Sequence, residues 1–279
     1  MSSKSDHLQR TADNTRENVV SMATIIGMRD ESKTVKSLKL KVHDKRVAFK
    51  AGQWVDMFIP GVDKVGGFSM WSRPSQLLTD QTLDLAIKYS DHPPAMWVHT
   101  ECKVGTEVHV RVGGDIYFDR DASQNLERKD PNLLLIAGGI GINPIISIMS
   151  HVADLKTRED NSDSGKERAE PGYSGKCALL YSSSTVDELL FKDHILSICE
   201  SFPHDMKYYL HATQEGSQLP DSIRKKRIDD SDLQECLTYL GTENILTYIC
   251  GPPPMIHSIE EKLLKMGLQQ NQILYEKWW

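Results

Sequence analysis

The sequence predicts two domains, an N-terminal antiparallel β-barrel and a C-terminal α/β domain with a parallel sheet. Up to about residue 125, short apolar–polar alternations are separated by Gly and Pro turns, as in half-buried antiparallel strands. From residue 130 onward, continuous apolar runs alternate with helical periodicity, as in βαβ units. We place a disordered polar tail at 1–18, the barrel at 19–125 and the second domain at 130–279.

The composition narrows the class of protein. The chain has 279 residues, of which 39% are hydrophobic and 26% charged, as in globular proteins. Its net charge of −6 and the lack of a basic cluster argue against a nucleic-acid partner. No apolar run approaches the roughly 20 residues of a transmembrane segment, and residues 1–18 do not read as a secretory signal. The five cysteines are widely spaced, which favours reduced thiols in an intracellular compartment over disulfides or a metal site.

Three segments of the first domain predict strands, because apolar side chains recur at every second position over 83–87 and 108–112 and in near-alternation over 35–42. Turn signals lie between and around them, at 50–52, 60–61, 65–67, 93–94 and 113–114. Short strands at this spacing predict a small antiparallel barrel.

The most informative stretch runs from 133 to 144. A buried strand at 133–137 is followed by three glycines within four positions, and Pro144 suits the first turn of a helix. A glycine turn that feeds a helix N-terminus offers N–H groups and a positive dipole to a phosphate, so we interpret it as the pyrophosphate cradle of NAD. A plain connector between strand and helix is the other interpretation. The residues of the cradle are Gly138, Gly139, Ile140, Gly141, Ile142, Asn143 and Pro144.

A second unit of the same kind begins at 245–250, an apolar strand followed by Gly251 and three prolines and then by a helical stripe that ends at Gly267. Two such units predict a doubly wound sheet that binds its ligand at the carboxyl ends of the strands. Further segments fit this pattern: strands at 177–181 and 207–213, a helix at 189–202, and polar loops at 156–176 and 215–231, the first of them exposed and mobile.

Together these motifs resemble the ferredoxin–NADP reductase superfamily, over about residues 20–279. The segment 49–55 resembles its F-x-x-G-Q strand, 138–144 its dinucleotide loop and 250–253 its late C-G-P-P motif. Within the superfamily, V-G-G-F-S at 65–69 and H-P-P-A-x-W-V-H at 92–99 resemble the oxidoreductase NAD-binding domain-containing proteins. The resemblance implies a flavin-reductase-like barrel of the FAD-binding FR type and a Rossmann-like NAD-binding domain.

The R-x-Y-S flavin motif of that superfamily aligns with Gly66, Phe68 and Ser69. In the family the arginine pairs with the flavin phosphate, the tyrosine stacks on the isoalloxazine ring and the serine bonds the reactive ring nitrogen. The arginine is absent here, whereas Phe68 can still stack and Ser69 can still bond. The second flavin element aligns with 93–96, which has no hydroxyl, and Arg73 is a candidate for the missing charge. FAD binding therefore stays open.

The resemblance also implies catalytic roles. Hydride would pass from NADH to the flavin, with Cys250 beside the nicotinamide and Ser69 tuning the flavin, while Gly251 and Pro252 contact the cofactor. The alternative for Cys250 is a small apolar residue at a strand end. Trp279 is expected either to stack on the flavin or to pack at the domain interface.

Polar residues at two further strand ends are candidates for the adenosine ribose. Tyr181 and Ser182 close one predicted strand, and Thr213 closes another at the same edge. The alternative is an ordinary polar turn. No Arg or Lys lies between Leu179 and Phe191, which favours NAD over NADP because a 2′-phosphate calls for a cation.

Two functions remain from the sequence. The first is an NAD(H)-dependent oxidoreductase, a flavoprotein that passes hydride between NADH and a flavin, with an unidentified electron acceptor. The second is a non-catalytic NAD(H)-binding module with a degenerate flavin barrel, acting as a sensor or assembly partner. The resemblance implies a location in the mitochondrion.

Overall fold

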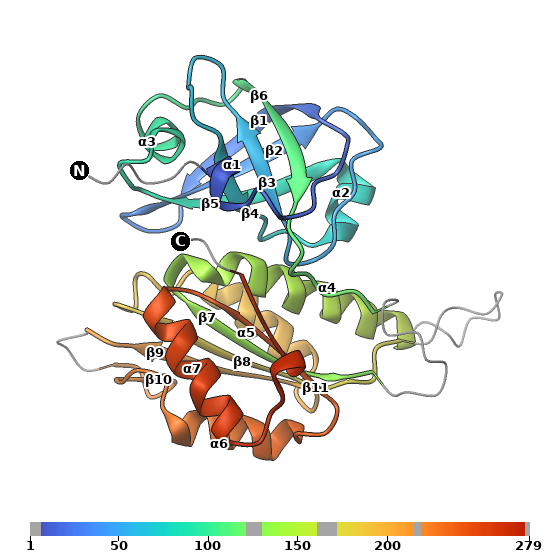
Figure 1. The fold of residues 1–279 in the computed structure, drawn as a ribbon, viewed down its shortest axis with the longest axis vertical. Coiled ribbons are helices and arrows are strands. Elements are labelled where there is room, and N and C mark those ends of the chain that lie inside the picture. Colours follow the sequence, from blue (N-terminus) through green and yellow to red (C-terminus); the bar gives the residue numbers. More distant parts are fainter. Residues whose placement is uncertain (1–6, 121–129, 161–171, 215–218, 277–279) are drawn as a thin grey trace. The chain divides into compact units, whose positions relative to one another are not determined.

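The computed structural model describes residues 7–120, 130–160, 172–214 and 219–276. The chain divides into two compact units. Unit 1 comprises Met1–Phe118 with Lys277–Trp279, and unit 2 comprises Asp119–Glu276. The division after Phe118 lies just ahead of the polar stretch where the sequence places the boundary. Each unit is described by itself (Figure 1).

Unit 1 contains a six-stranded antiparallel sheet in the order β4-β3-β6-β1-β2-β5. Met70, directly after β4, forms an antiparallel bridge with Leu85 of β5, so the two ends of the sheet meet as in a barrel. The strands are β1 (Ser21–Asp30), β2 (Val35–Val42), β3 (Trp54–Phe58), β4 (Gly66–Ser69), β5 (Thr82–Lys88) and β6 (Glu107–Gly113), and the helices are α1 (His7–Arg10), α2 (Pro74–Asp80) and α3 (Pro93–Thr100).

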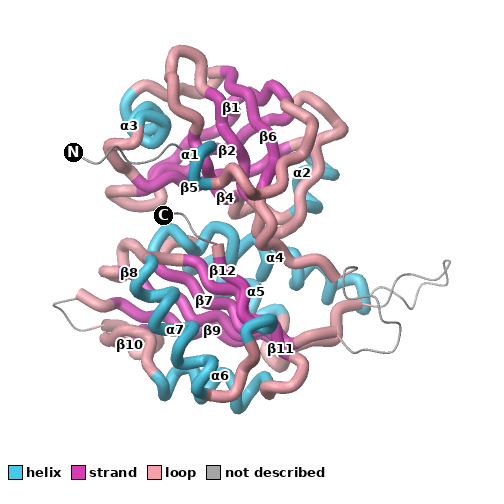
Figure 2. The backbone as a smooth tube through the Cα atoms, in the orientation of Figure 1, coloured by secondary structure: helices cyan, strands magenta, loops and turns pink. Residues whose placement is uncertain are grey.

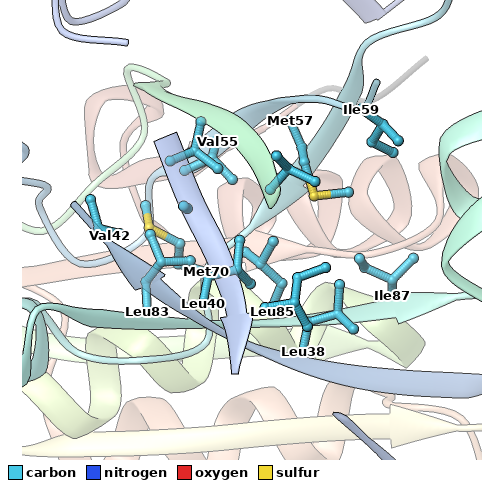
Figure 3. Packing of buried hydrophobic residues seen from close by; sticks show 14 of the residues in the cluster. Leu38, Leu40, Val42, Val55, Met57, Ile59, Met70, Leu83, Leu85 and Ile87 are labelled. Carbon is cyan, nitrogen blue, oxygen red and sulfur yellow. The ribbon is translucent and has the colours of Figure 1, made fainter. Parts of the chain in front are cut away.

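The alternation predicted for these strands corresponds to one apolar face per strand. Leu38, Leu40 and Val42 of β2 are buried, and they pack with Val55 and Met57 of β3 in one core cluster (Figure 3). Their neighbours on β2, such as Lys39 and Lys41, are exposed. Because side chains in a strand alternate between faces, the period of two places the apolar set inside.

The structure corrects the expectation of a disordered tail at 1–18 for residues 7–18, while residues 1–6 lie outside the described residues. His7–Arg10 form α1, Arg16 bridges to Gly113, and the Glu17 N–H donates to the Val112 carbonyl at 2.9 Å. A buried carboxylate, Asp56, accepts hydrogen bonds from both His7 and Arg16. The polar side chains that suggested disorder therefore include His7 and Arg16, which hold this segment against unit 1 through Asp56.

Unit 2 contains a parallel six-stranded sheet in the order β10-β9-β8-β7-β11-β12. α6 and α7 pack on one face of it and α4 and α5 on the other (Figures 1 and 2). The strands are β7 (Asn132–Gly138), β8 (Cys177–Ser183), β9 (Met206–Ala212), β10 (Ile223–Arg224), β11 (Ile245–Cys250) and β12 (Ile273–Tyr275), and the helices are α4 (Ile142–Asp160), α5 (Lys192–Ser201), α6 (Asp230–Leu240) and α7 (Pro253–Lys265), with short 3-10 turns η2 (Gly139–Gly141) and η4 (Gln270–Gln272).

The two loops expected in this unit are shorter than the sequence indicates. α4 extends to Asp160, and Lys156, placed in the first loop, is buried with its ammonium donating to the Tyr173 carbonyl at 3.1 Å. Within the second, β10 adds an edge strand beside β9, and Asp229 caps α6 through a reciprocal bond with Asp232. Residues 161–171 of the first loop and 215–218 of the second lie outside the described residues.

Candidate dinucleotide-binding site

The centre of the unit 2 sheet is a topological switch point. The chain runs from β7 through β8 to β9 on one side and then returns to β11 on the other side of β7. Cys250 at the end of β11 pairs with Ala137, so Gly138 and Gly251 follow at the same carboxyl edge. Crevices of this kind are where open α/β sheets bind ligands.

Three glycines bring the two loops at this edge together. A Cβ on Gly141 would lie 2.3 Å from the Cys250 carbonyl oxygen, and one on Gly138 would lie 2.6 Å from the Met255 sulfur. A Cβ on Gly251 would lie 3.1 Å from the Gly138 Cα. These glycines therefore serve the packing of backbone against backbone and against α7.

Gly139 differs from the other glycines of the loop. Its φ is +54°, a left-handed conformation, and a Cβ there would meet nothing within 4 Å. Helix α4 begins three residues later, and the Ile142 N–H already bonds the carbonyls of Gly139 and Ile140. Pro144 lies in the first turn, as the sequence predicts. An open glycine before the N-terminus of a 19-residue helix fits a phosphate group.

The loop after β11 forms the opposite wall of this opening. Cys250 is 5% exposed at the strand end, and Pro252 is the exposed N-cap of α7. Pro253 and Pro254 occupy the first turn of α7, where the missing N–H groups cost nothing. Asn143, on the α4 side, is buried with 3% exposure.

The ribose candidates separate into two kinds. Tyr181 is fully buried, and its hydroxyl donates to the Glu188 carbonyl at 3.2 Å and accepts the Leu190 N–H at 3.0 Å. Its side chain therefore holds the loop after β8 rather than lining the edge of the sheet. Ser182 is partly exposed, and the Thr213 hydroxyl donates to the Ser183 carbonyl at 3.2 Å. Ser182 and Thr213 are thus at the carboxyl edge beside the glycine turn.

A buried His–Asp pair at this edge has no counterpart among the residues singled out from the sequence. His211, beside Ser182 in the register, is fully buried, with its Nε2 4.0 Å from Asp232. Burial lowers the pKa of His211, although the Asp232 carboxylate acts in the opposite direction. Asp232 also pairs with Arg224 and Lys226, so it ties β10 to α6. The D-x-x-D spacing of the α6 cap is the sequence signal that could have indicated it.

In unit 1, the residues aligned with the flavin phosphate contacts lack a cation and, at two prolines, a backbone N–H donor. Gly66 carries no cation, and Pro93 and Pro94 at the start of α3 have no N–H. The Met96 N–H donates to the His92 carbonyl at 3.0 Å. Arg73 is exposed at the N-cap of α2. The residues aligned with the flavin phosphate contacts therefore supply neither the arginine nor the hydroxyl of the superfamily motif.

Other predicted features can be placed briefly. Ser69 ends β4 and is 8% exposed, and Trp279 lies outside the described residues. Among the described residues, no cluster of three or more His, Cys, Asp or Glu side chains could hold a metal ion, and none of the cysteines forms a disulfide. In the same part of the chain, no helix combines the length and apolar character of a membrane span.

Comparisons with known proteins agree with this geometry. The model of the oxidoreductase NAD-binding domain family matches residues 135–261, which include the glycine turn and the loop after β11. A solved ferredoxin–NADP⁺ reductase from Neisseria gonorrhoeae, with bound FAD and NADP, superposes with a TM-score of 0.68 at 19% identity, over 93% of this chain and 99% of its own length. The two-domain fold is therefore that of the ferredoxin–NADP reductases.

Two curated relatives show how similar the sequence is to known proteins. The reductase component DmpP of a Pseudomonas phenol 2-monooxygenase is 26% identical, over 90% of this chain and 63% of its own length. Oxidoreductase NAD-binding domain-containing protein 1 of Xenopus laevis is 45% identical, over 100% of this chain and 85% of its own length. The chain therefore belongs to the oxidoreductase NAD-binding domain-containing protein 1 family.

Proposed function

We propose that the chain is an NAD(H)-dependent oxidoreductase whose dinucleotide binds at the carboxyl edge of the unit 2 sheet. The observation that carries the proposal is Gly139, which is left-handed and open on the side facing away from its neighbours. It lies between a central parallel strand and the N-terminus of α4, where helix dipole and main-chain donors favour an anion. The family model and the reductase relative support the same ligand class.

The residues of unit 2 then divide the work of binding. The turn from Gly139 to Asn143 takes the pyrophosphate, and Gly141 keeps that turn against the β11 end. Ser182 and Thr213 contact the adenosine ribose, while Cys250, Gly251 and Pro252 border the nicotinamide. A nicotinamide dinucleotide supplies hydride chemistry, in which two electrons and a proton leave C4 of the reduced ring for an acceptor.

The acceptor is the part of the function that departs from the family pattern. The sequence resemblance predicts a flavin as the immediate hydride acceptor. The residues of unit 1 aligned with the flavin phosphate contacts lack the arginine and the hydroxyl of the family motif. The hydride acceptor is instead a molecule that reaches the nicotinamide from outside the chain.

A second candidate is a non-catalytic NAD(H)-binding module that acts as a sensor or assembly partner. The observation that favours it is the substitution of the flavin phosphate contacts by Gly66 and the α3 prolines. Both candidates require NAD(H) binding. They differ in turnover: an oxidoreductase consumes NADH in the presence of a small artificial acceptor such as ferricyanide, whereas a module is thermally stabilised by NADH without consuming it.

The binding site itself is tested by Gly139→Asp, with Gly139→Asn as the matched control. Both residues tolerate left-handed backbone, so both variants should fold. They have the same shape, and Asp alone adds a negative charge beside the pyrophosphate. We expect Asp to weaken NADH binding at least tenfold more than Asn, about 1.4 kcal/mol, in isothermal titration calorimetry at low salt. Equal affinities for NADH in the two variants would place the phosphates elsewhere and overturn the proposal.

The same titrations distinguish the two nicotinamide dinucleotides. The segment between Leu179 and Phe191 has no Arg or Lys to pair with a 2′-phosphate. NADH should therefore bind more tightly than NADPH. Tighter binding of NADPH would contradict this preference while leaving the pyrophosphate site intact.

A further inference from the structure

We propose that unit 1 holds no resident flavin, because the Phe68 and His7 side chains of this chain occupy the space above Gly66 and Gly67 of β4, where the flavin motif of the superfamily aligns. The inference concerns unit 1 alone and does not depend on NAD(H) binding in unit 2. The missing phosphate contacts already weaken the case for FAD. The side chains over β4 add a steric reason, which applies to the flavin ring itself.

One face of β4 is covered by Phe68. A Cβ on Gly66 would lie 2.3 Å from Cε2 of the Phe68 ring and 3.0 Å from Cβ of Pro94. The ring therefore occupies the space that a side chain at position 66 would need, and it also packs against the barrel core. An aromatic ring folded over a glycine in an edge strand is a stabilising arrangement. In this position the Phe68 ring is used for packing within unit 1.

The other face of β4 is covered by His7. A Cβ on Gly67 would lie 2.1 Å from Cε1 and 2.2 Å from Nδ1 of the His7 ring, so the imidazole rests on the glycine backbone. The His7 side chain is 2% exposed and its Nε2 is 2.9 Å from an Asp56 carboxylate oxygen. The residue that shields this face thus comes from the segment preceding β1.

His7 is held in place by a network of charge and stacking. Asp56 is fully buried and also accepts hydrogen bonds from Arg16 at 2.9 Å and from Arg111 at 2.6 Å. The His7 ring meets the Trp54 ring edge-to-face at 4.9 Å between centroids, and the Arg16 guanidinium lies 5.0 Å from the same ring. Displacing His7 would disturb a buried carboxylate that these three side chains share, which makes the cover a stable part of unit 1.

The first experiment uses the full wild-type chain, expressed with excess riboflavin. Bound flavin is measured by its visible absorption after denaturation, and FAD, FMN and riboflavin are then titrated while flavin fluorescence is followed. We expect no released flavin and no saturable binding tighter than about 0.1 mM. Stoichiometric FAD in the purified chain, or micromolar reconstitution with FAD, would overturn the proposal.

The second experiment tests the cause. His7→Ala/Phe68→Ala removes both covers. His99→Ala/Tyr89→Ala is the control, because it also truncates one histidine and one aromatic side chain of unit 1, which form an edge-to-face pair with centroids 5.4 Å apart. Circular dichroism melting selects folded variants. The first pair should bind all three flavins at least tenfold more tightly than wild type, with little preference for FAD because the phosphate contacts remain absent. A folded His7→Ala/Phe68→Ala variant that binds flavin no better than the control overturns steric closure as the cause.

NADH titration of the same wild-type sample separates this inference from the proposed function. NADH binding without flavin supports both. Flavin binding without NADH binding would overturn both, and flavin binding together with NADH binding would overturn the closure alone.

Discussion

The glycines of β4 in unit 1 and Gly139 after β7 in unit 2 differ in what occupies the space above them. In unit 1, side-chain rings lie over the glycines, with Phe68 over Gly66, His7 over Gly67 and the Trp54 ring within 2.7 Å of a Cβ on Gly113. In unit 2, a Cβ on Gly139 would meet nothing within 4 Å. The glycines of β4 thus lie beneath rings of the chain itself, whereas the left-handed glycine that follows β7 leaves an opening.

A glycine in a sequence motif can therefore have at least three structural roles. It makes room for a ring, as at Gly67; it lets two backbones touch, as at Gly141; or it takes a left-handed turn that stays open, as at Gly139. The one-letter pattern is the same in each case.

Gly141→Val should be the most damaging change. Its Cβ would lie 2.3 Å from the Cys250 carbonyl oxygen, a backbone atom that cannot turn away. We expect a loss of about 3 kcal/mol of unfolding free energy together with loss of NADH binding. Gly27→Val is the control, because its Cβ would be in ordinary contact, 3.4 Å from Lys39, and its effect should be within about 0.5 kcal/mol. Equal urea midpoints for the two variants would contradict the tight packing.

Asp56→Ala tests how much the shared carboxylate contributes to the stability of unit 1. It would leave His7, Arg16 and Arg111 without their shared carboxylate. The two arginines are 14% and 26% exposed and can turn to solvent, so we expect a loss of about 2 kcal/mol rather than the full cost of a buried unpaired charge. The control is Asp115→Ala, an exposed acceptor for Asn14, which should cost less than about 1 kcal/mol. Urea unfolding of the full chain measures both.

The same carboxylate predicts a pH dependence. Burial alone raises the pKa of Asp56, but hydrogen bonds from His7, Arg16 and Arg111 outweigh it and hold the pKa below the ordinary value of 3.8. A carboxyl whose folded pKa is lowered contributes stability that is present above its unfolded pKa and is lost as the pH falls through the folded pKa. Between about pH 5 and pH 3, wild type should therefore lose stability more steeply than Asp56→Asn. Parallel urea midpoints over this range would argue that the carboxylate adds nothing.

Tyr181→Phe should have the smallest effect, and it tests whether Tyr181 belongs to the dinucleotide site. Removing the hydroxyl leaves the buried Leu190 N–H without its acceptor, which we expect to cost about 1–2 kcal/mol. Because the hydroxyl faces the protein interior, the Kd for NADH should change by less than about twofold. Tyr89→Phe, at a ring that is 49% exposed, controls for the loss of a hydroxyl. A large change in the NADH Kd would return Tyr181 to the ribose site.

The elements that could be predicted from the sequence are those with local signals. The period of two in 35–42 matches β2, and the continuous apolar runs match β7 and β11. The glycine turn and Pro144 could be placed because their chemistry depends on neighbours in the chain. The pairing of His7 with Asp56 joins residues 49 positions apart, and the Tyr181 hydroxyl depends on how a later loop folds back. Such contacts carry no local pattern, so the polar composition of 1–18 suggested a disordered tail, and the place of Tyr181 at a predicted strand end suggested a ribose contact.

The docked segment before β1 has a practical consequence for anyone who trims or tags this chain. Ends with polar, helix-poor sequences are usually treated as safe places for a protease site or a fusion partner. A cut between Thr11 and Arg16 would detach His7 and leave Arg16 at a new terminus, with Arg111 as the remaining internal partner of Asp56. Low stability or aggregation of such a shortened chain would then result from the cut itself, and would not show that the barrel of the full chain is unstable.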